Sequence, residues 1–122
     1  MKELEMHDKM RIVQELVPGR QITLLHVIAN PDPILYQKLG LDPKLDYSHA
    51  AIGVLTISPA ETAVITADIA LKASGAELGF VDRFSGTLII TGTVDEVEAS
   101  FEAITTYFKN TLKFSVCDVT RT

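Results

Sequence analysis

Five consecutive residues place an acid, a base, an aromatic ring and a hydroxyl group side by side: Asp82, Arg83, Phe84, Ser85 and Gly86. Such groups build acid–base and nucleophilic catalytic sites, so catalysis is the first hypothesis for this segment. Adjacent residues of an extended chain point to opposite sides, however, so Asp82 and Arg83 are poorly placed to act together. Ser85 lacks the G-x-S-x-G frame of a nucleophile elbow and has no base nearby in the sequence. The pattern therefore favours a polar hairpin turn in which Gly86 supplies a positive φ angle.

The other reactive side chains also lack partner groups at a suitable spacing. His26 alternates with aliphatic residues and has no second His, Cys or carboxylate at metal-ligand spacing, which favours a core or interface histidine. Cys117, the only cysteine, excludes an internal disulfide, fits a reducing cytosol and is expected to pack as a small apolar residue. Asp68 and Lys72 are four residues apart on a predicted helix, where a weak surface ion pair is expected. We therefore predict no catalytic residues, no metal and no cofactor.

The composition limits the class of protein. The chain has 122 residues, which suits one domain, and 47% of them are apolar, which favours an oligomer that buries part of its surface. A net charge of −5 argues against general nucleic-acid binding, because phosphates require a basic face. No apolar stretch approaches the ~20 residues of a membrane span, and the N-terminal MKELEMHDKM does not resemble a signal peptide. These features predict a single-domain cytoplasmic protein that binds neither nucleic acid nor membrane.

The hydrophobic pattern predicts elements in the order β-β-α-β-α-β-β-α-β, an α+β fold with helices on one side of a sheet. Residues 21–30 form a predicted strand that places Ile22, Leu24, His26 and Ile28 on one face. The other predicted elements are a strand at 11–17, a short helix at 33–41, a strand at 50–57, a helix from Ser58 to Ser74, two strands within 76–90, a helix from Thr93 to about Leu112 and a strand-like tail at 113–122. Residues 42–49 are predicted to be a surface loop.

Both long helices are expected to begin at a capping box. The segment Ser58-Pro59-Ala60-Glu61 combines a capping serine, a proline at the first helical position and a glutamate at the third. In the helix that follows, polar residues form only a narrow stripe, so we expect both flanks to be buried, one against the sheet and one against another subunit. The second box, Thr93-Val94-Asp95-Glu96, begins a helix whose apolar face comprises Val97, Phe101, Ile104, Phe108 and Leu112.

The segment from Ala51 to Ala99 resembles the core of bacterial microcompartment (BMC) shell proteins. Typical members have a helix that ends in a lysine, matched by Ala70-Leu71-Lys72, and then a hairpin loop, typically K-I-G-S-G, whose place is taken by residues 82–86. The next helix of these proteins begins with the sequence G-x-V-x-x-V, which residues 92–97 match. Their C-terminal strand, typically H-V-I-P-R-P, resembles residues 26–31, which here come near the beginning. This order is similar to the circularly permuted class found in ethanolamine- and propanediol-utilisation compartments.

The resemblance implies a permuted BMC domain at residues 21–122, a ferredoxin-like antiparallel sheet with helices on one side, preceded by an extension at residues 1–20. It also implies a homohexamer that tiles with other shell proteins, with encapsulated enzymes as further candidate partners. The loop at 82–86 would line a central pore, and Lys72 and Asn30 would lie at the hexamer edge. A six-stranded barrel over the pore would take one strand from each chain, formed by Arg11, Ile12, Val13, Gln14, Glu15, Leu16 and Val17.

Two departures from the family pattern bear on these roles. Asn30 replaces the arginine of H-V-I-P-R-P, which removes the hydrogen bonds that this arginine would make at the edge. The loop at 82–86 carries a charged pair and a phenylalanine in place of small residues, which indicates a small or capped pore.

Three functions remain open from the sequence. The leading hypothesis is a structural, non-enzymatic shell subunit. The second keeps the hexamer and lets the 82–86 loop gate or bind a small metabolite at the axis. The third, from another class, is a ferredoxin-like regulatory module that binds a small molecule between subunits and stops at dimers or trimers.

Overall fold

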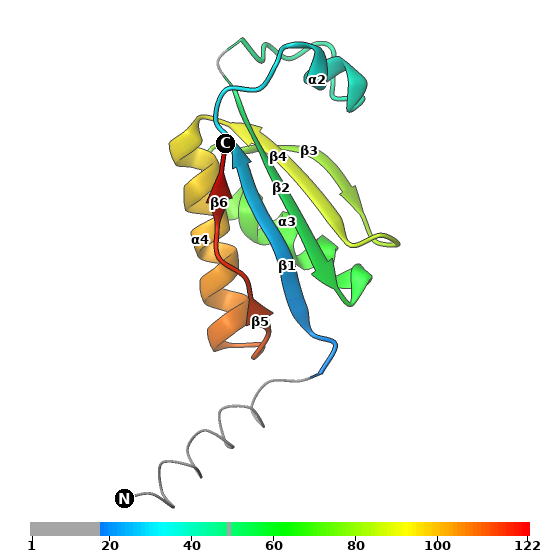
Figure 1. Ribbon diagram of the computed structural model, residues 1–122, viewed down its shortest axis with the longest axis vertical. Coiled ribbons are helices and arrows are strands. Elements are labelled where there is room, and N and C mark those ends of the chain that lie inside the picture. The colour runs from blue at the N-terminus through cyan, green and yellow to red at the C-terminus, as the bar shows by residue number, and fades with distance from the viewer. Residues whose placement is uncertain (1–17, 49) are drawn as a thin grey trace, which may run out of the picture.

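The computed structural model describes residues 18–48 and 50–122, which form one sheet flanked by helices (Figure 1). The strands are β1 (Gln21–Ile28), β2 (Ala51–Ser58), β3 (Glu77–Asp82), β4 (Thr87–Gly92), β5 (Ser115–Val116) and β6 (Thr120–Arg121). The helices are α2 (Ile34–Lys38), α3 (Ala63–Ala73) and α4 (Val94–Asn110), and a 3-10 turn, η1 (Ala60–Thr62), precedes α3. The predicted α+β class is confirmed, while the predicted strand at 11–17 lies outside the described residues.

The sheet has the strand order β3-β4-β2-β1-β5, and β6 also pairs with β1. The pairs β1–β2, β2–β4 and β3–β4 are antiparallel, whereas β5 and β6 run parallel to β1. The sheet is therefore antiparallel except at this edge. The cause is that α4 returns the chain to the start of β1, where the Ser115 N–H donates to the Arg20 carbonyl (3.1 Å), and the tail then follows β1 in the same direction.

Helices α3 and α4 pack against each other and against one face of the sheet (Figure 1). The face of α4 that meets the sheet carries Val97, Phe101, Ile104 and Phe108, all fully buried, as the sequence predicts. The fifth predicted residue, Leu112, lies beyond the end of α4 at Asn110 and packs against the core only partly buried. The sheet contributes fully buried aliphatic residues from three strands, among them Leu25, Val27, Leu55, Leu88 and Ile90.

The predicted apolar face of β1 is wrong in one respect. The register with β2 shifts between Ile22 and Leu24, and such a β-bulge interrupts the two-residue alternation of side chains. Ile22 therefore shares the core face with Leu25, whereas His26 and Ile28 lie on the opposite face with Leu24.

The predicted capping box at Ser58 is also wrong. Pro59 is extended, with ψ at 149°, so the chain has not yet entered a helix, and no side chain caps η1. Instead, the N–H and the hydroxyl of Thr62 both donate to the Pro59 carbonyl, and α3 begins only after this turn. The box at Thr93 is confirmed: its hydroxyl accepts from the Glu96 N–H (3.1 Å) and Glu96 Oε1 accepts from the Thr93 N–H (2.9 Å).

The β1–β2 connection (residues 29–50, described except for residue 49) extends from one end of the sheet and carries α2 (Figure 1). Its Leu41 packs with Ile52 and Ile89 on the sheet face that α3 and α4 leave open, next to Tyr36. The expectation of helices on one side thus holds for α3 and α4, while α2 belongs to this connection. No helix within residues 18–48 and 50–122 is long and apolar enough to cross a membrane.

Candidate functional site

The β3–β4 loop (residues 82–86) is a compact turn held by hydrogen bonds to Asp82. Its Oδ1 accepts from the Phe84 N–H (2.9 Å), its Oδ2 from the Ser85 hydroxyl (2.8 Å), and its carbonyl from the Gly86 N–H (2.9 Å). The Phe84 N–H and then the Ser85 hydroxyl lower the pKa of Asp82, because both stabilise the charged carboxylate. The predicted polar hairpin turn is confirmed, and both carboxylate oxygens of Asp82 accept hydrogen bonds inside it.

Gly86 anchors this loop to the end of β2. Its φ angle is +74°, as predicted, and a Cβ at this position would lie 2.2 Å from the carbonyl oxygen of Ile57 and 3.1 Å from the Cα of Ala60. The Gly86 carbonyl accepts a hydrogen bond from the Ile57 N–H (2.9 Å). The loop therefore has little freedom to move relative to β2 and the start of η1.

The two side chains at the tip of the loop lie in solvent. Phe84 is 81% exposed, more than any other large apolar side chain in the described residues. Arg83 is exposed too, and its guanidinium carbon lies 5.0 Å from the centre of the Phe84 ring, in cation–π range. Within residues 18–48 and 50–122, Arg83 forms no salt bridge.

The loop contains no activated nucleophile. The hydroxyl of Ser85 bonds only Asp82 and the Thr87 hydroxyl (2.9 Å) among the described residues. A carboxylate whose pKa is lowered is a poor general base, so this contact does not prepare Ser85 to attack a substrate.

His26 and Cys117 have structural surroundings. The half-buried ring of His26 bonds the hydroxyls of Thr120 (2.6 Å) and Thr122 (2.9 Å), which ties β1 to the C-terminal tail. Cys117 packs against the core, and burial raises the pKa of its thiol, as suits a small apolar residue. Among the described residues, no group of three or more His, Cys, Asp or Glu side chains could hold a metal ion.

The predicted site residues lie at two opposite ends of the sheet. The β3–β4 loop lies where β2 ends, since Thr56 pairs with Thr87, and next to the start of η1. Lys72 is in the last turn of α3, a helix about 16 Å long at 1.5 Å per residue. Asn30 is exposed at the start of the β1–β2 connection, at the end away from the loop. The structure thus separates the loop from Lys72 and Asn30.

The predicted ion pair on α3 is confirmed. Lys72 Nζ lies 2.9 Å from Asp68 Oδ2, and the two side chains are 75% and 60% exposed. Such exposed pairs contribute only about 0.3–0.5 kcal/mol, so Lys72 can exchange this partner for another at little cost.

Helix α3 and the edge strand β3 leave apolar side chains uncovered. On α3, Ala63, Ala67 and Ala70 are buried, which confirms burial of one flank. The rest of the helix exposes aliphatic side chains, and β3 exposes two more: Val64, Ile65, Leu71, Leu78 and Phe80. Burial of the other flank of α3 against a second subunit stays a prediction.

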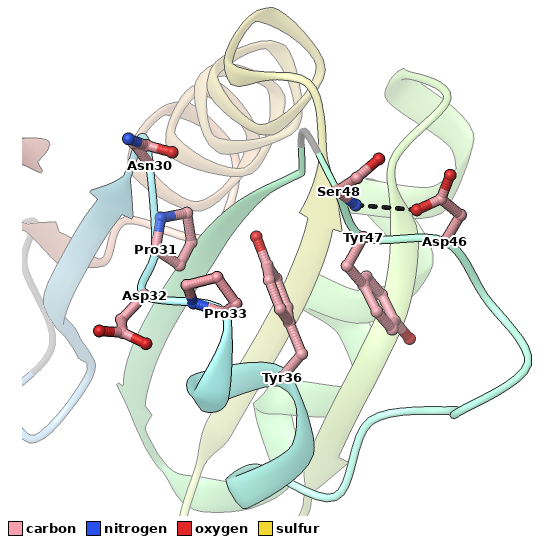
Figure 2. Close-up of a pocket in the computed structure, with 8 residues that line it drawn as sticks. All are labelled: Asn30, Pro31, Asp32, Pro33, Tyr36, Asp46, Tyr47 and Ser48. Atoms are coloured by element: carbon pink, nitrogen blue, oxygen red, sulfur yellow. Dashed lines mark hydrogen bonds between the residues drawn. The ribbon is translucent and has the colours of Figure 1, made fainter.

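The sequence did not indicate the pocket at the β1–β2 connection, which has a volume of about 550 Å³ (Figure 2). Tyr36 and Tyr47 stack beside it with ring centres 4.9 Å apart, and the Tyr36 hydroxyl donates to the Ala50 carbonyl (2.6 Å). Burial raises the pKa of both tyrosines. The available signal in the sequence was the pair of tyrosines that flank residues 37–46, a segment with one glycine and one proline. The lining residues are Asn30, Pro31, Asp32, Pro33, Tyr36, Asp46, Tyr47 and Ser48.

Comparisons with known proteins agree with this fold. Residues 51–119, more than half of the chain, match the family described as BMC domain. The chain is 50% identical over 111 residues to the bacterial microcompartment shell protein CutR of Streptococcus intermedius (91% of each chain). It is 45% identical over 112 residues to the shell protein PduU of Salmonella typhimurium (92% of this chain, 93% of that protein). It is 43% identical over 114 residues to the shell protein EutS of Escherichia coli, a match that covers 93% of this chain and 98% of that protein.

Solved structures of CutR also match this chain. A structure described as a CutR flat hexamer, form 2, matches with a TM-score of 0.78 at 47% identity, covering 87% of this chain and 86% of that one. A CutR screw form with a 41.9 Å pitch matches equally well, with a TM-score of 0.78 at 47% identity, covering 86% of this chain and 100% of that one. The identity and coverage of these matches are high enough to assign the family. The chain therefore belongs to the BMC-domain family of bacterial microcompartment shell proteins.

Proposed function

We propose that this protein is a structural, non-enzymatic subunit of a bacterial microcompartment shell in the cytoplasm, and that it forms homohexamers that tile with other shell proteins. The observation that carries this proposal is the match to a flat hexamer at 47% identity over 87% of the chain. The absence of an activated nucleophile or a metal-binding group in the described residues supports it.

The orientation of the chain in the hexamer follows from the residues at the two ends of the sheet. We assign the β3–β4 loop to the six-fold axis, where it would line a small pore, and Lys72 and Asn30 to the hexamer edge. The separation of these residues along α3 supports a radial arrangement, because the loop lies beside the start of η1 and Lys72 lies in the last turn. The exposed ion pair of Lys72 leaves it available to a neighbouring tile.

The contact between subunits would bury the exposed aliphatic side chains of α3, which are Val64, Ile65 and Leu71. An aliphatic surface of this kind is a common feature of interfaces that persist. Within residues 18–48 and 50–122, strand β3 is also an edge of the sheet, so its outward backbone groups need a partner or water.

The permuted order and the barrel belong to the same proposal. The family match begins at Ala51, while β1, which pairs with β2 in the centre of the sheet, comes before it. This arrangement supports a circular permutation with a domain at residues 21–122. We assign residues 1–20 to an extension whose residues 11–17 form the barrel strand that caps the pore.

Light scattering on the purified protein tests the hexamer. A mass of six chains across micromolar concentrations is expected, and electron microscopy should show flat sheets. The pocket beside Tyr36 and Tyr47 favours one other function, a small-molecule regulatory module. A stable dimer or trimer would contradict the shell proposal and support that alternative.

A further inference from the structure

We propose that the β1–β2 connection binds a small alkylammonium ion at the stacked rings of Tyr36 and Tyr47. The ammonium group would lie between the Tyr36 ring and the nearby carboxylates, and the alkyl group in the apolar hollow next to it. This inference goes beyond the proposed shell function, because the site lies within one chain and at the other end of the sheet from the β3–β4 loop.

The first step concerns the shape of the site. Two hollows meet at the stacked rings, which line both of them, and their volumes are about 550 Å³ and 570 Å³. Both volumes are within the ~300–1,000 Å³ range of small-molecule sites. Figure 2 shows Tyr36 between the segment at residues 31–33 and Tyr47. Each ring covers one face of the other and both are only half-buried, so part of each ring stays open to a ligand.

The second step concerns charge. Asp32 and Asp46 line the first hollow, and a smaller hollow that shares Tyr47 adds Glu77. Within residues 18–48 and 50–122, no lysine or arginine lines any of the three hollows. The negative charge reaches the ring: burial raises the pKa of Tyr47, and the charges of Asp42 and Glu77 raise it further. The site therefore favours a cation over an anion.

The third step concerns the contacts of the ammonium group. The face of an aromatic ring attracts an ammonium ion, so ring and carboxylates favour the same ligand. Asp32 can contribute without giving up its own turn. Its Oδ1 accepts from the Ile34 N–H (3.1 Å), and both carboxylate oxygens keep lone pairs for a further donor. On the opposite side, Asp46 Oδ1 accepts from the Ser48 N–H (3.0 Å), which fixes the position of a second negative charge (Figure 2).

The fourth step concerns the rest of the ligand. Besides the tyrosines, the second hollow is lined mainly by two prolines and two leucines, Leu41 and Leu45, and its described lining residues include no charged side chain. An alkyl chain placed there leaves water, which raises affinity by up to about fourfold for each buried methylene. A bare metal ion fits the site less well, because no group of three or more His, Cys, Asp or Glu among the described residues could hold one.

Titration calorimetry on the purified protein tests this inference. The probe is n-butylammonium, and 1-butanol and butyrate carry the same type of chain with no charge and with a negative charge. We expect one butylammonium per chain, binding of butanol at least about tenfold weaker, and no binding of butyrate. Affinity should fall with ionic strength and from butylammonium to methylammonium. Tyrosine emission gives a second readout, because the chain has no tryptophan and the site holds two of its three tyrosines.

Variants assign the binding to the pocket. Tyr47→Phe keeps the ring and should bind within about twofold of the parent, whereas Tyr47→Leu should weaken binding about threefold to fivefold. Asp32→Asn keeps an oxygen for the Ile34 N–H and removes the charge, so a loss of about fivefold is expected. It decides the question if Tyr47→Leu does not fold. Glu102→Gln is the matched control, because it makes the same change in charge on α4, across the sheet, and should bind as the parent does.

Three results would overturn the inference: no saturable binding of butylammonium, binding of butanol as tight as that of butylammonium, or equal affinity in Asp32→Asn and Glu102→Gln. Light scattering on each sample separates this inference from the shell function. A hexamer that binds no butylammonium removes the pocket ligand and leaves the shell function intact. Binding by a stable dimer or trimer supports the pocket ligand and contradicts the shell function.

Discussion

The segments at the two ends of the sheet are held in place by different interactions. At one end, the five-residue β3–β4 loop satisfies its own polar groups, and Gly86 packs so closely on Ile57 that a Cβ has no space. At the other, the β1–β2 connection spans residues 29–50, has open pockets on its surface and relies on a stacked tyrosine pair and Leu41 to hold it to the sheet. The difference indicates a rigid end at the proposed axis and an adaptable end at the proposed edge.

A matched pair of glycines gives the strongest test of this contrast. Gly86 and Gly40 have similar φ angles, +74° and +70°, but a Cβ at Gly40 would meet nothing within 4 Å. Gly40→Ala should therefore cost only the strain of a positive φ, about 1 kcal/mol. Gly86→Ala should cost about 3 kcal/mol or more, because the Ile57 carbonyl must also be displaced. Urea unfolding at one fixed protein concentration measures both. Equal losses in the free energy of unfolding would mean that the loop accommodates a Cβ as readily as the connection does.

Features that depend on neighbouring residues could be predicted from the sequence, whereas features that depend on tertiary contacts could not. The turn chemistry of the loop, the capping box at Thr93 and the apolar face of α4 are local patterns, and each is confirmed. The bulge in β1 and the late start of α3 were missed, because they depend on pairing with β2 and on the extended backbone of Pro59. The pocket beside Tyr36 was missed for the same reason, since its walls come from segments that only the tertiary fold brings together.

The tyrosine pair gives a second, smaller test, at the adaptable end. Tyr36→Phe removes the hydrogen bond to the Ala50 carbonyl and leaves the ring stack, so the free energy of unfolding should fall by about 1 kcal/mol. Tyr47→Phe is the companion variant, because it keeps the ring stack and the bond to Ala50 and removes only the hydroxyl that bonds the Asp42 backbone. Thermal unfolding of the two variants compares them. A larger loss for Tyr47→Phe would show that the Tyr47 hydroxyl, and not the Tyr36 bond to Ala50, holds the connection.

Asp82 provides a test of the rigid end through pH. Its pKa is lower in the folded protein than in the unfolded chain, because the carboxylate accepts bonds from Phe84 and Ser85. Its charged form therefore stabilises the fold above the usual carboxylate range, and this contribution is lost as pH falls through the lowered pKa. Asp82→Asn should lower Tm at neutral pH by less than Gly86→Ala does, and the difference from the parent should shrink in acid. A constant difference at all pH values would mean that the charge of Asp82 does not support the turn.

The smallest effect on stability, and the sharpest on assembly, is expected at Lys72. Lys72→Ala and Asp68→Ala break the same exposed ion pair, so both should lose only about 0.3–0.5 kcal/mol and remain hexameric. Only Lys72→Ala removes the cation proposed to meet a neighbouring tile, so electron microscopy should show loss of extended sheets in that variant alone. If both variants form sheets as the parent does, Lys72 has no role at the edge. If both lose them, the ion pair matters because it shapes the end of α3, and the adaptable edge must lie elsewhere in the β1–β2 connection.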